Sequence, residues 1–189
     1  MTPRNRHGLA LLIWAACIAP CFARSPAPEV GTLAPDFRAH NLITGDRVDL
    51  AGERGKLVIL TFWATWCGPC RRELPMLESA QKLVGKDKLT VFAVNFRETP
   101  EAAAAVKKIA KTWQLTLVED RNGSIAGRYR ISAVPHLFII GRNGQILAEH
   151  LGYGDSSLDE LVSDINSALS QPSARPEVAP PEDQAASMP

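Results

Sequence analysis

Two cysteines separated by two residues are the part of this sequence best suited to chemistry. Cys67 and Cys70 enclose a Gly-Pro dipeptide, and this spacing can close a small disulfide ring. The spacing alone leaves half of a zinc site as an alternative. An apolar run over residues 57–63 precedes the pair, and a helical stretch from residue 71 to about residue 86 follows it. A junction between a buried strand and a helix favours redox chemistry over metal binding.

The position of the pair predicts which sulfur reacts. Cys67 meets the positive end of the dipole of the following helix, where free backbone N–H groups favour thiolate over thiol. Thiolate is the species that attacks a disulfide, so we expect Cys67 to be the nucleophile and the more exposed sulfur. Cys70, one turn further along, would resolve the mixed disulfide. A static bridge is disfavoured because so short a loop saves little chain entropy.

The first 23 residues have the features of a secretory signal. A positively charged start is followed by an apolar stretch over residues 9–19 and by small residues at the two cleavage-reading positions, Cys21 and Ala23, and we predict cleavage after Ala23. Cleavage would remove Cys17 and Cys21 and leave a single cysteine pair in an oxidising compartment. We therefore expect a periplasmic or otherwise extracytoplasmic protein. A retained membrane anchor and a lipid on Cys21 are the alternatives.

The rest of the chain is predicted to hold one domain with short ends. We assign residues 24–30 to a linker, residues 31–170 to the domain, and residues 171–189 to a disordered tail rich in proline, alanine and acid. The chain has 21 basic and 20 acidic residues without a basic block, which argues against nucleic acid binding. We expect a monomer without a cofactor.

Strands alternate with helices along the predicted domain. We expect strands at residues 57–63, 89–96, 115–118, 134–140 and 145–150, and helices at residues 71–86, 101–113, 124–130 and 156–169. Residues 42–50, with Gly45 and Asp46 at their centre, predict a hairpin, and Asp155 or Ser156 is the expected cap of the last helix. The order predicts an α/β fold with a partly parallel central sheet and helices on both faces.

Four short segments occur in an order that is typical of a known family. They are Phe62 to Pro75 around the cysteines, Gly31 with Ala34-Pro35-Asp36-Phe37, Gly55-Lys56, and Val134-Pro135. With these segments the chain resembles the thioredoxin superfamily, and within it the exported TlpA/ResA-like thiol–disulfide oxidoreductases. The resemblance covers about residues 31 to 169, although peroxiredoxins share the opening segment. It implies a thioredoxin-like mixed β-sheet flanked by helices, an extra N-terminal β-hairpin and a cis proline facing the disulfide.

The resemblance also gives roles to residues around the cysteines. ResA-like proteins carry an acid at the position of Glu73 that assists proton transfer, whereas cytosolic thioredoxins carry one in the strand, where this chain has Thr61. Glu73 would then replace the missing strand carboxylate. The alternatives are a solvated helix residue and an anionic first-turn residue favoured by the helix dipole. Trp66 would cover the disulfide. Gly68 and Pro69 match the reducing thioredoxins, which favours a low reduction potential.

The segment before the predicted hairpin would complete the site. Pro135 is expected to be cis, so that the backbone of Val134 faces an incoming substrate strand. His136 departs from the family pattern, since relatives carry threonine after this proline. It could tune thiol acidity or, with Cys67 and Cys70, hold copper(I). A partly buried strand residue is the alternative reading.

These features predict an exported enzyme that reduces protein disulfides. A membrane disulfide reductase would return it to the dithiol state, and relatives serve cytochrome c maturation, oxidase assembly or sporulation. A copper-handling protein of the same fold is the second hypothesis, with His136 as the residue that separates the two. A peroxiredoxin is the third, and it would need a peroxidatic cysteine in a local context that this sequence lacks.

Overall fold

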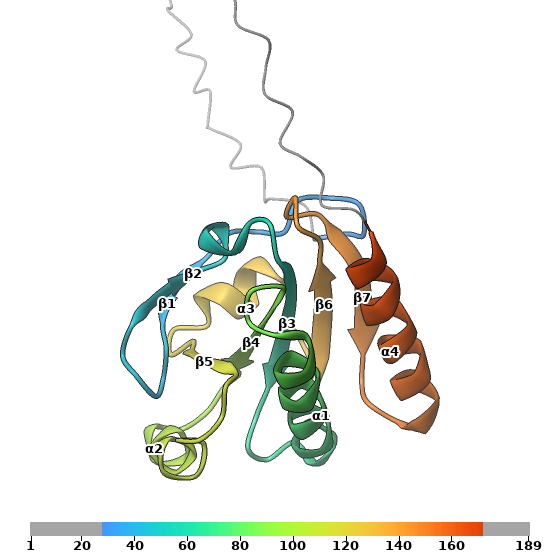
Figure 1. Cartoon of the computed structure of the whole chain (residues 1–189). Helices are drawn as coiled ribbons and strands as arrows, with labels where there is room; N and C mark the ends of the chain where they lie inside the picture. The colour runs from blue at the N-terminus through green and yellow to red at the C-terminus, as the bar shows by residue number, and fades with distance from the viewer. Residues whose placement is uncertain (1–27, 172–189) are drawn as a thin grey trace, which may run out of the picture.

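The computed structural model of the chain describes residues 28–171 (Figure 1). The elements are β1 (Arg38–His40), β2 (Arg47–Asp49), a 3-10 turn η1 (Ala51–Glu53), β3 (Leu57–Trp63), α1 (Gly68–Val84), β4 (Leu89–Asn95), α2 (Pro100–Ile109), β5 (Thr116–Glu119), α3 (Ser124–Arg128), β6 (His136–Ile140), β7 (Ile146–Leu151) and α4 (Asp155–Ser170). The predicted signal and nearly all of the predicted tail lie outside the described residues. Within them, no helix has the length and apolar character needed to cross a membrane.

Five of the strands form one mixed sheet in the order β5-β4-β3-β6-β7. Strands β3, β4 and β5 run parallel, and β6 is antiparallel to both β3 and β7. Strands β1 and β2 form a separate antiparallel hairpin before them. This arrangement confirms the thioredoxin-like fold with its extra N-terminal hairpin.

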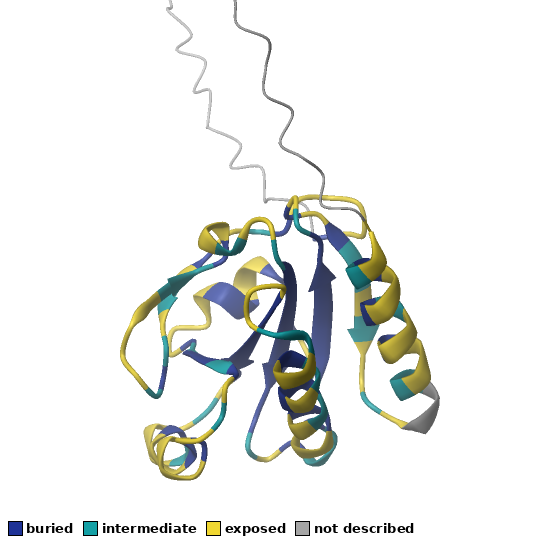
Figure 2. Cartoon of the chain, in the orientation of Figure 1, coloured by how far each residue is buried: buried dark blue, intermediate teal, exposed yellow. Residues whose placement is uncertain are grey.

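The sheet separates two apolar cores. Strands β3 and β4 are buried along their whole length, as expected for central strands with near-continuous apolar sequence. One core joins one face of the sheet to α1, α2 and α4, and it contains both cysteines. The other core joins the opposite face to α3 and the segment around Phe37. Figure 2 shows the buried strands between helices whose outer surfaces are exposed.

Three predicted elements differ from the structure by three residues or more. The two hairpin strands flank a turn at residues 41–46. The side-chain oxygen of Asn41 accepts hydrogen bonds from the backbone N–H groups of Ile43 and Thr44, which closes the turn there. Helix α1 begins at Gly68 rather than residue 71, with Cys67 as its N-cap. Helix α2 ends at Ile109 and does not reach residue 113.

The cap of the last helix also differs from the prediction. Gly154, rather than Asp155 or Ser156, occupies the N-cap position of α4. The hydroxyl of Ser157 accepts a hydrogen bond from the Gly154 N–H at 2.7 Å and donates to its carbonyl at 2.8 Å. These two bonds supply the capping that the glycine itself cannot, since it has no side chain.

The cysteine pair lies at one end of the sheet and the ends of the described chain lie at the other. Cys67 follows the carboxyl end of β3, beside the carboxyl end of β4. At the start of the described chain, the Gly31 N–H donates to the carbonyl of Ile146. At its end, the Arg142 guanidinium donates to the carbonyl of Gln171. Both bonds lie near the β6–β7 turn, at the opposite end of the sheet (Figure 1). The fold therefore presents the pair away from both termini of the domain.

Candidate active site

Cys67 and Cys70 form a disulfide at the start of α1. The S–S distance is 2.09 Å and the Cα atoms are 5.3 Å apart. The Sγ atom of Cys67 accepts a hydrogen bond from the Cys70 N–H at 3.2 Å. Gly68 and Pro69 form the first turn, where the proline costs no hydrogen bond because these N–H groups have no partner within the helix. A reduced Cys67 at this place would face the positive end of the helix.

Exposure distinguishes the two sulfurs as predicted. Cys67 keeps 5% of its surface exposed, while Cys70 has none. Of the two residues, Cys67 is the one with surface open to an incoming thiol or disulfide. Trp66 is 61% exposed, so its indole lies at the surface beside Cys67. This placement suits contact with a partner.

Glu73 lies on the buried side of α1, three residues after Cys70. It is only 2% exposed and lies beyond the first turn of α1, so neither alternative, a solvated helix residue or an anionic first-turn residue, applies. The hydroxyl of Thr61 donates to its Oε1 atom at 2.6 Å. Burial raises the pKa of Glu73 to about 7, and the hydrogen bond from Thr61 partly opposes this rise. A carboxyl group with such a pKa can hold or release a proton near neutral pH.

The predicted cis proline is present beside this site. The Val134–Pro135 peptide bond is cis, as expected from the family resemblance. Pro135 is buried and Val134 is half-buried at the entry to β6. Because β6 begins opposite Phe62, near the carboxyl end of β3, this segment lies at the same end of the sheet as Cys67.

The structure does not bring His136 to the cysteines. Its ring stacks on Phe138, with centroids 4.7 Å apart, and its Nε2 atom is 2.7 Å from Glu149. Phe138 belongs to the core on the sheet face opposite the one that holds the cysteines. Across residues 28–171, no group of three or more His, Cys, Asp or Glu side chains is placed to hold a metal ion. His136 is thus a buried strand residue, as the alternative reading had it.

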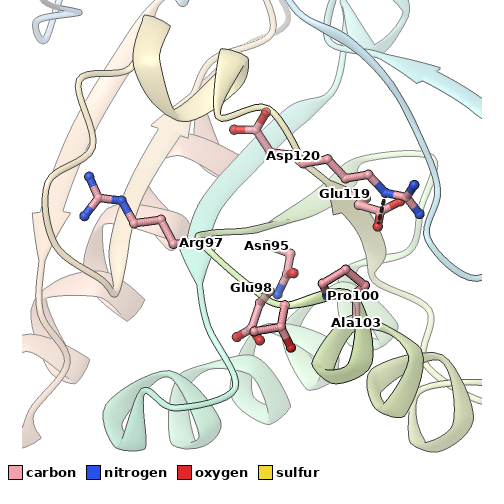
Figure 3. A pocket seen from close by; sticks show the side chains of 9 residues that line it. Asn95, Arg97, Glu98, Pro100, Ala103, Glu119 and Asp120 are labelled. Atoms are coloured by element: carbon pink, nitrogen blue, oxygen red, sulfur yellow. Dashed lines mark ion pairs between the residues drawn. The ribbon is translucent and has the colours of Figure 1, made fainter.

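Sequence reasoning missed one acidic residue near the pair. Glu98, in the loop between β4 and α2, contacts Thr65 two residues before Cys67. It also lines a cavity of about 260 Å³ together with Asn95, Pro100 and Ala103 (Figure 3). The carboxyl ends of neighbouring parallel strands meet at one edge of a sheet, and this rule could have pointed to the loop.

Comparison with known proteins identifies the family of the chain. A sequence model described as the AhpC/TSA family matches residues 30–149. The chain belongs to the AhpC/TSA family. Its match spans the N-terminal hairpin, the cysteine pair, the cis proline and all but the end of β7.

Two relatives within this family indicate the type of activity. The chain is 40% identical over 126 residues to the thioredoxin-like protein YneN of Bacillus subtilis, covering 66% of this chain and 72% of that protein. It is 35% identical over 127 residues to the thiol-disulfide oxidoreductase ResA of Geobacillus kaustophilus, covering 66% and 71%.

A solved structure supports the same activity. A Chlorobium tepidum protein described as the thiol:disulfide interchange protein DsbE matches with a TM-score of 0.68 and 30% identity, covering 76% of this chain and 99% of that one. With the Cys67–Cys70 disulfide at the helix start, these similarities identify a thioredoxin-like thiol–disulfide oxidoreductase.

Proposed function

We propose that this AhpC/TSA family member reduces disulfides in exported proteins through Cys67 and Cys70. The observation that carries the proposal is a disulfide at a helix start, in which Cys67 keeps some exposed surface, with a buried carboxyl group one helical turn after Cys70. In the dithiol form, the Cys67 thiolate attacks one sulfur of the substrate disulfide. The substrate S–S bond breaks, a mixed disulfide forms, and the leaving thiolate takes up a proton.

Cys70 completes the exchange. Its thiol loses a proton, and the resulting thiolate attacks the Cys67 sulfur of the mixed disulfide. This step releases the second substrate thiol and leaves Cys67 and Cys70 joined, as in the structure. The substrate gains two electrons and the enzyme is oxidised. A membrane disulfide reductase is the proposed donor that restores the dithiol.

Glu73 is the proposed proton acceptor for Cys70. It follows Cys70 by three residues, one turn along the same helix, and both side chains lie in the interior. With a pKa raised to about 7 by burial, its carboxylate can accept the Cys70 proton near neutral pH. The backbone at Val134, beside the cis proline, is the proposed contact for the substrate chain, with Trp66 at its edge.

The proposed setting is outside the cytoplasm, reached through the predicted N-terminal signal. Cytochrome c maturation and oxidase assembly are the processes that the family resemblance offers. The direction of electron flow rests on the Gly68-Pro69 dipeptide, which matches reducing thioredoxins. A reduction potential near −270 mV would support reduction of substrates, and one near −120 mV would contradict it.

A trapping experiment tests the mechanism. The Cys70→Ala variant, reduced and mixed with extracts of exported proteins, should accumulate mixed disulfides through Cys67. Mass spectrometry of the trapped partners would name the substrate, and the Cys67→Ala variant is the matched control that should trap nothing. If the Cys70→Ala variant forms no mixed disulfide, the proposed function is wrong.

A further inference from the structure

A short turn at residues 64–67 leads into α1 and places Cys67 at the start of the helix. The N–H of Cys67 donates to the carbonyl of Ala64 at 3.2 Å, which closes a turn with Thr65 and Trp66 at its centre. Trp66 is largely exposed. The conformation of this turn therefore sets where the indole and the nucleophilic sulfur lie.

One carboxylate from a distant part of the chain holds this turn. Glu98 accepts a hydrogen bond from the Thr65 N–H through Oε1, and a second from the Thr65 hydroxyl through Oε2 at 3.0 Å. From the other side, Arg71 of α1 donates to the Thr65 carbonyl at 3.2 Å. The N–H, hydroxyl and carbonyl groups of Thr65 are thus all hydrogen-bonded, to Glu98 of the β4–α2 loop and to Arg71 of α1.

Glu98 is itself held in a well-anchored loop. The preceding residue, Arg97, has a φ of 50°, which is uncommon for a residue other than glycine. Its guanidinium lies over the ring of Phe96 at 4.9 Å, and the Phe96 N–H donates to the carbonyl of Trp63 at 2.8 Å. On the other side, Thr99 caps α2 by accepting from the Ala102 N–H at 3.2 Å. Both flanks of Glu98 are therefore fixed.

We propose that Glu98 is a positioning residue for disulfide exchange. Its carboxylate fixes the turn at residues 64–67, and through it the approach geometry of Cys67. The inference rests on the proposed function, because it concerns attack by the same sulfur. Attack on a disulfide depends on alignment, and a displacement of about 1 Å can cost up to about a hundredfold in rate.

Three variants separate geometry from charge. Glu98→Ala removes both hydrogen bonds. Glu98→Gln removes the charge but keeps the shape: its carbonyl oxygen can accept from the Thr65 N–H, and its amide can donate to the Thr65 hydroxyl. Glu101→Ala removes an acid three residues away, in the exposed first turn of α2, and is the matched control.

The measurements use the reduced full-length chain. One is the second-order rate with a protein disulfide, and the other is the pH dependence of Cys67 alkylation. We expect Glu98→Ala to lower the rate about tenfold and to shift the alkylation profile, because the sulfur leaves its fixed place at the helix start. Glu98→Gln should restore most of the rate, and Glu101→Ala should match the wild type.

Two outcomes with the Glu98 variants would overturn the proposal. One is a Glu98→Ala variant that is folded by circular dichroism and keeps the wild-type rate and alkylation profile. The other is a Glu98→Gln variant that is as slow as Glu98→Ala. If Glu98→Ala does not fold, Thr65→Val replaces it: loss of the hydroxyl bond alone should cost about threefold in rate, and an unchanged rate overturns the proposal. A wild-type chain that reduces no disulfide would instead contradict the proposed function.

Discussion

Two threonine–glutamate pairs flank the cysteine turn, and they differ in burial. Thr61 and Glu73 meet inside the core, joined by one hydrogen bond of 2.6 Å. Thr65 and Glu98 meet in a half-buried position, where the carboxylate accepts from both the hydroxyl and the backbone N–H. The residue types are the same on both sides of the redox pair.

The difference shows that surroundings, rather than residue type, assign the role. Burial raises the pKa of Glu73 to about 7, so this carboxyl group is suited to moving a proton. Glu98 keeps partial contact with water, and its two bonds go to the turn that carries the nucleophile. The first pair is suited to proton transfer and the second to holding geometry. The predictions below test this division.

The largest expected effect is on stability. Burial raises the pKa of Glu73 from its ordinary value of 4.5 to about 7, so the folded chain binds its proton more tightly than the unfolded chain does. The stability it contributes is fully present below about pH 4.5 and is lost as the pH rises through about 7. Between pH 4 and pH 8.5, wild type should lose about 3 kcal/mol relative to Glu73→Gln, measured by denaturant unfolding of the oxidised proteins.

The control for this measurement is the Thr61→Val variant. It removes the hydrogen bond but leaves the carboxyl group buried, so its pH-dependent loss of stability should remain. A wild-type curve that runs parallel to the Glu73→Gln curve across this pH range would show that Glu73 does not titrate as a buried acid.

The next effect is on catalysis. Replacing Glu73 by glutamine removes the proposed acceptor of the Cys70 proton, while the amide keeps the volume of the side chain. Turnover of a protein disulfide near pH 7 should fall about a hundredfold, in the range typical of lost general acid–base catalysis. Acid-quenched samples should contain accumulated mixed disulfide, because resolution by Cys70 is the step that slows. Equal turnover by the two proteins would remove Glu73 from the mechanism.

A smaller effect should separate the two threonines. Thr61→Val removes the hydrogen bond that lowers the pKa of Glu73, so the pKa should rise further and the rate profile should move to higher pH. Thr65→Val should lower the rate about threefold and leave the midpoint of that profile in place. The measurement is the turnover rate between pH 5 and pH 9 for both variants. Identical shifts in the two profiles would contradict the division of roles.

The elements and the redox pair could be predicted because they depend on local sequence. The apolar run at residues 57–63 became β3 with its exact bounds, and the two cysteines lie at the predicted strand-to-helix junction. The start of α1 was missed by three residues: the helix begins at Gly68, and Pro69 belongs to its first turn, a position that proline suits. The cis bond at Pro135 came from family resemblance and not from local preference.

The rest of the site depends on contacts between distant residues. Glu98 lies 33 residues from Thr65, and no periodicity or motif connects them. For Glu73, spacing placed the carboxyl group near Cys70, but only the packed fold shows that it is buried. The direction of His136 was within reach of sequence reasoning: side chains alternate along a strand, and so His136 and Leu137 face opposite sides of β6.

The last prediction is that the His136→Ala substitution leaves copper(I) binding unchanged. Leu137 packs with the cysteines, whereas His136 stacks on Phe138 in the opposite core and contacts Glu149. The sheet itself separates the imidazole from the two thiolates. Any affinity of the reduced protein for copper(I) should therefore depend on Cys67 and Cys70, and competition with a chromophoric chelator should give the same affinity for His136→Ala and wild type. A large loss in His136→Ala would mean that reduction rearranges β6, which would revive the copper-handling hypothesis.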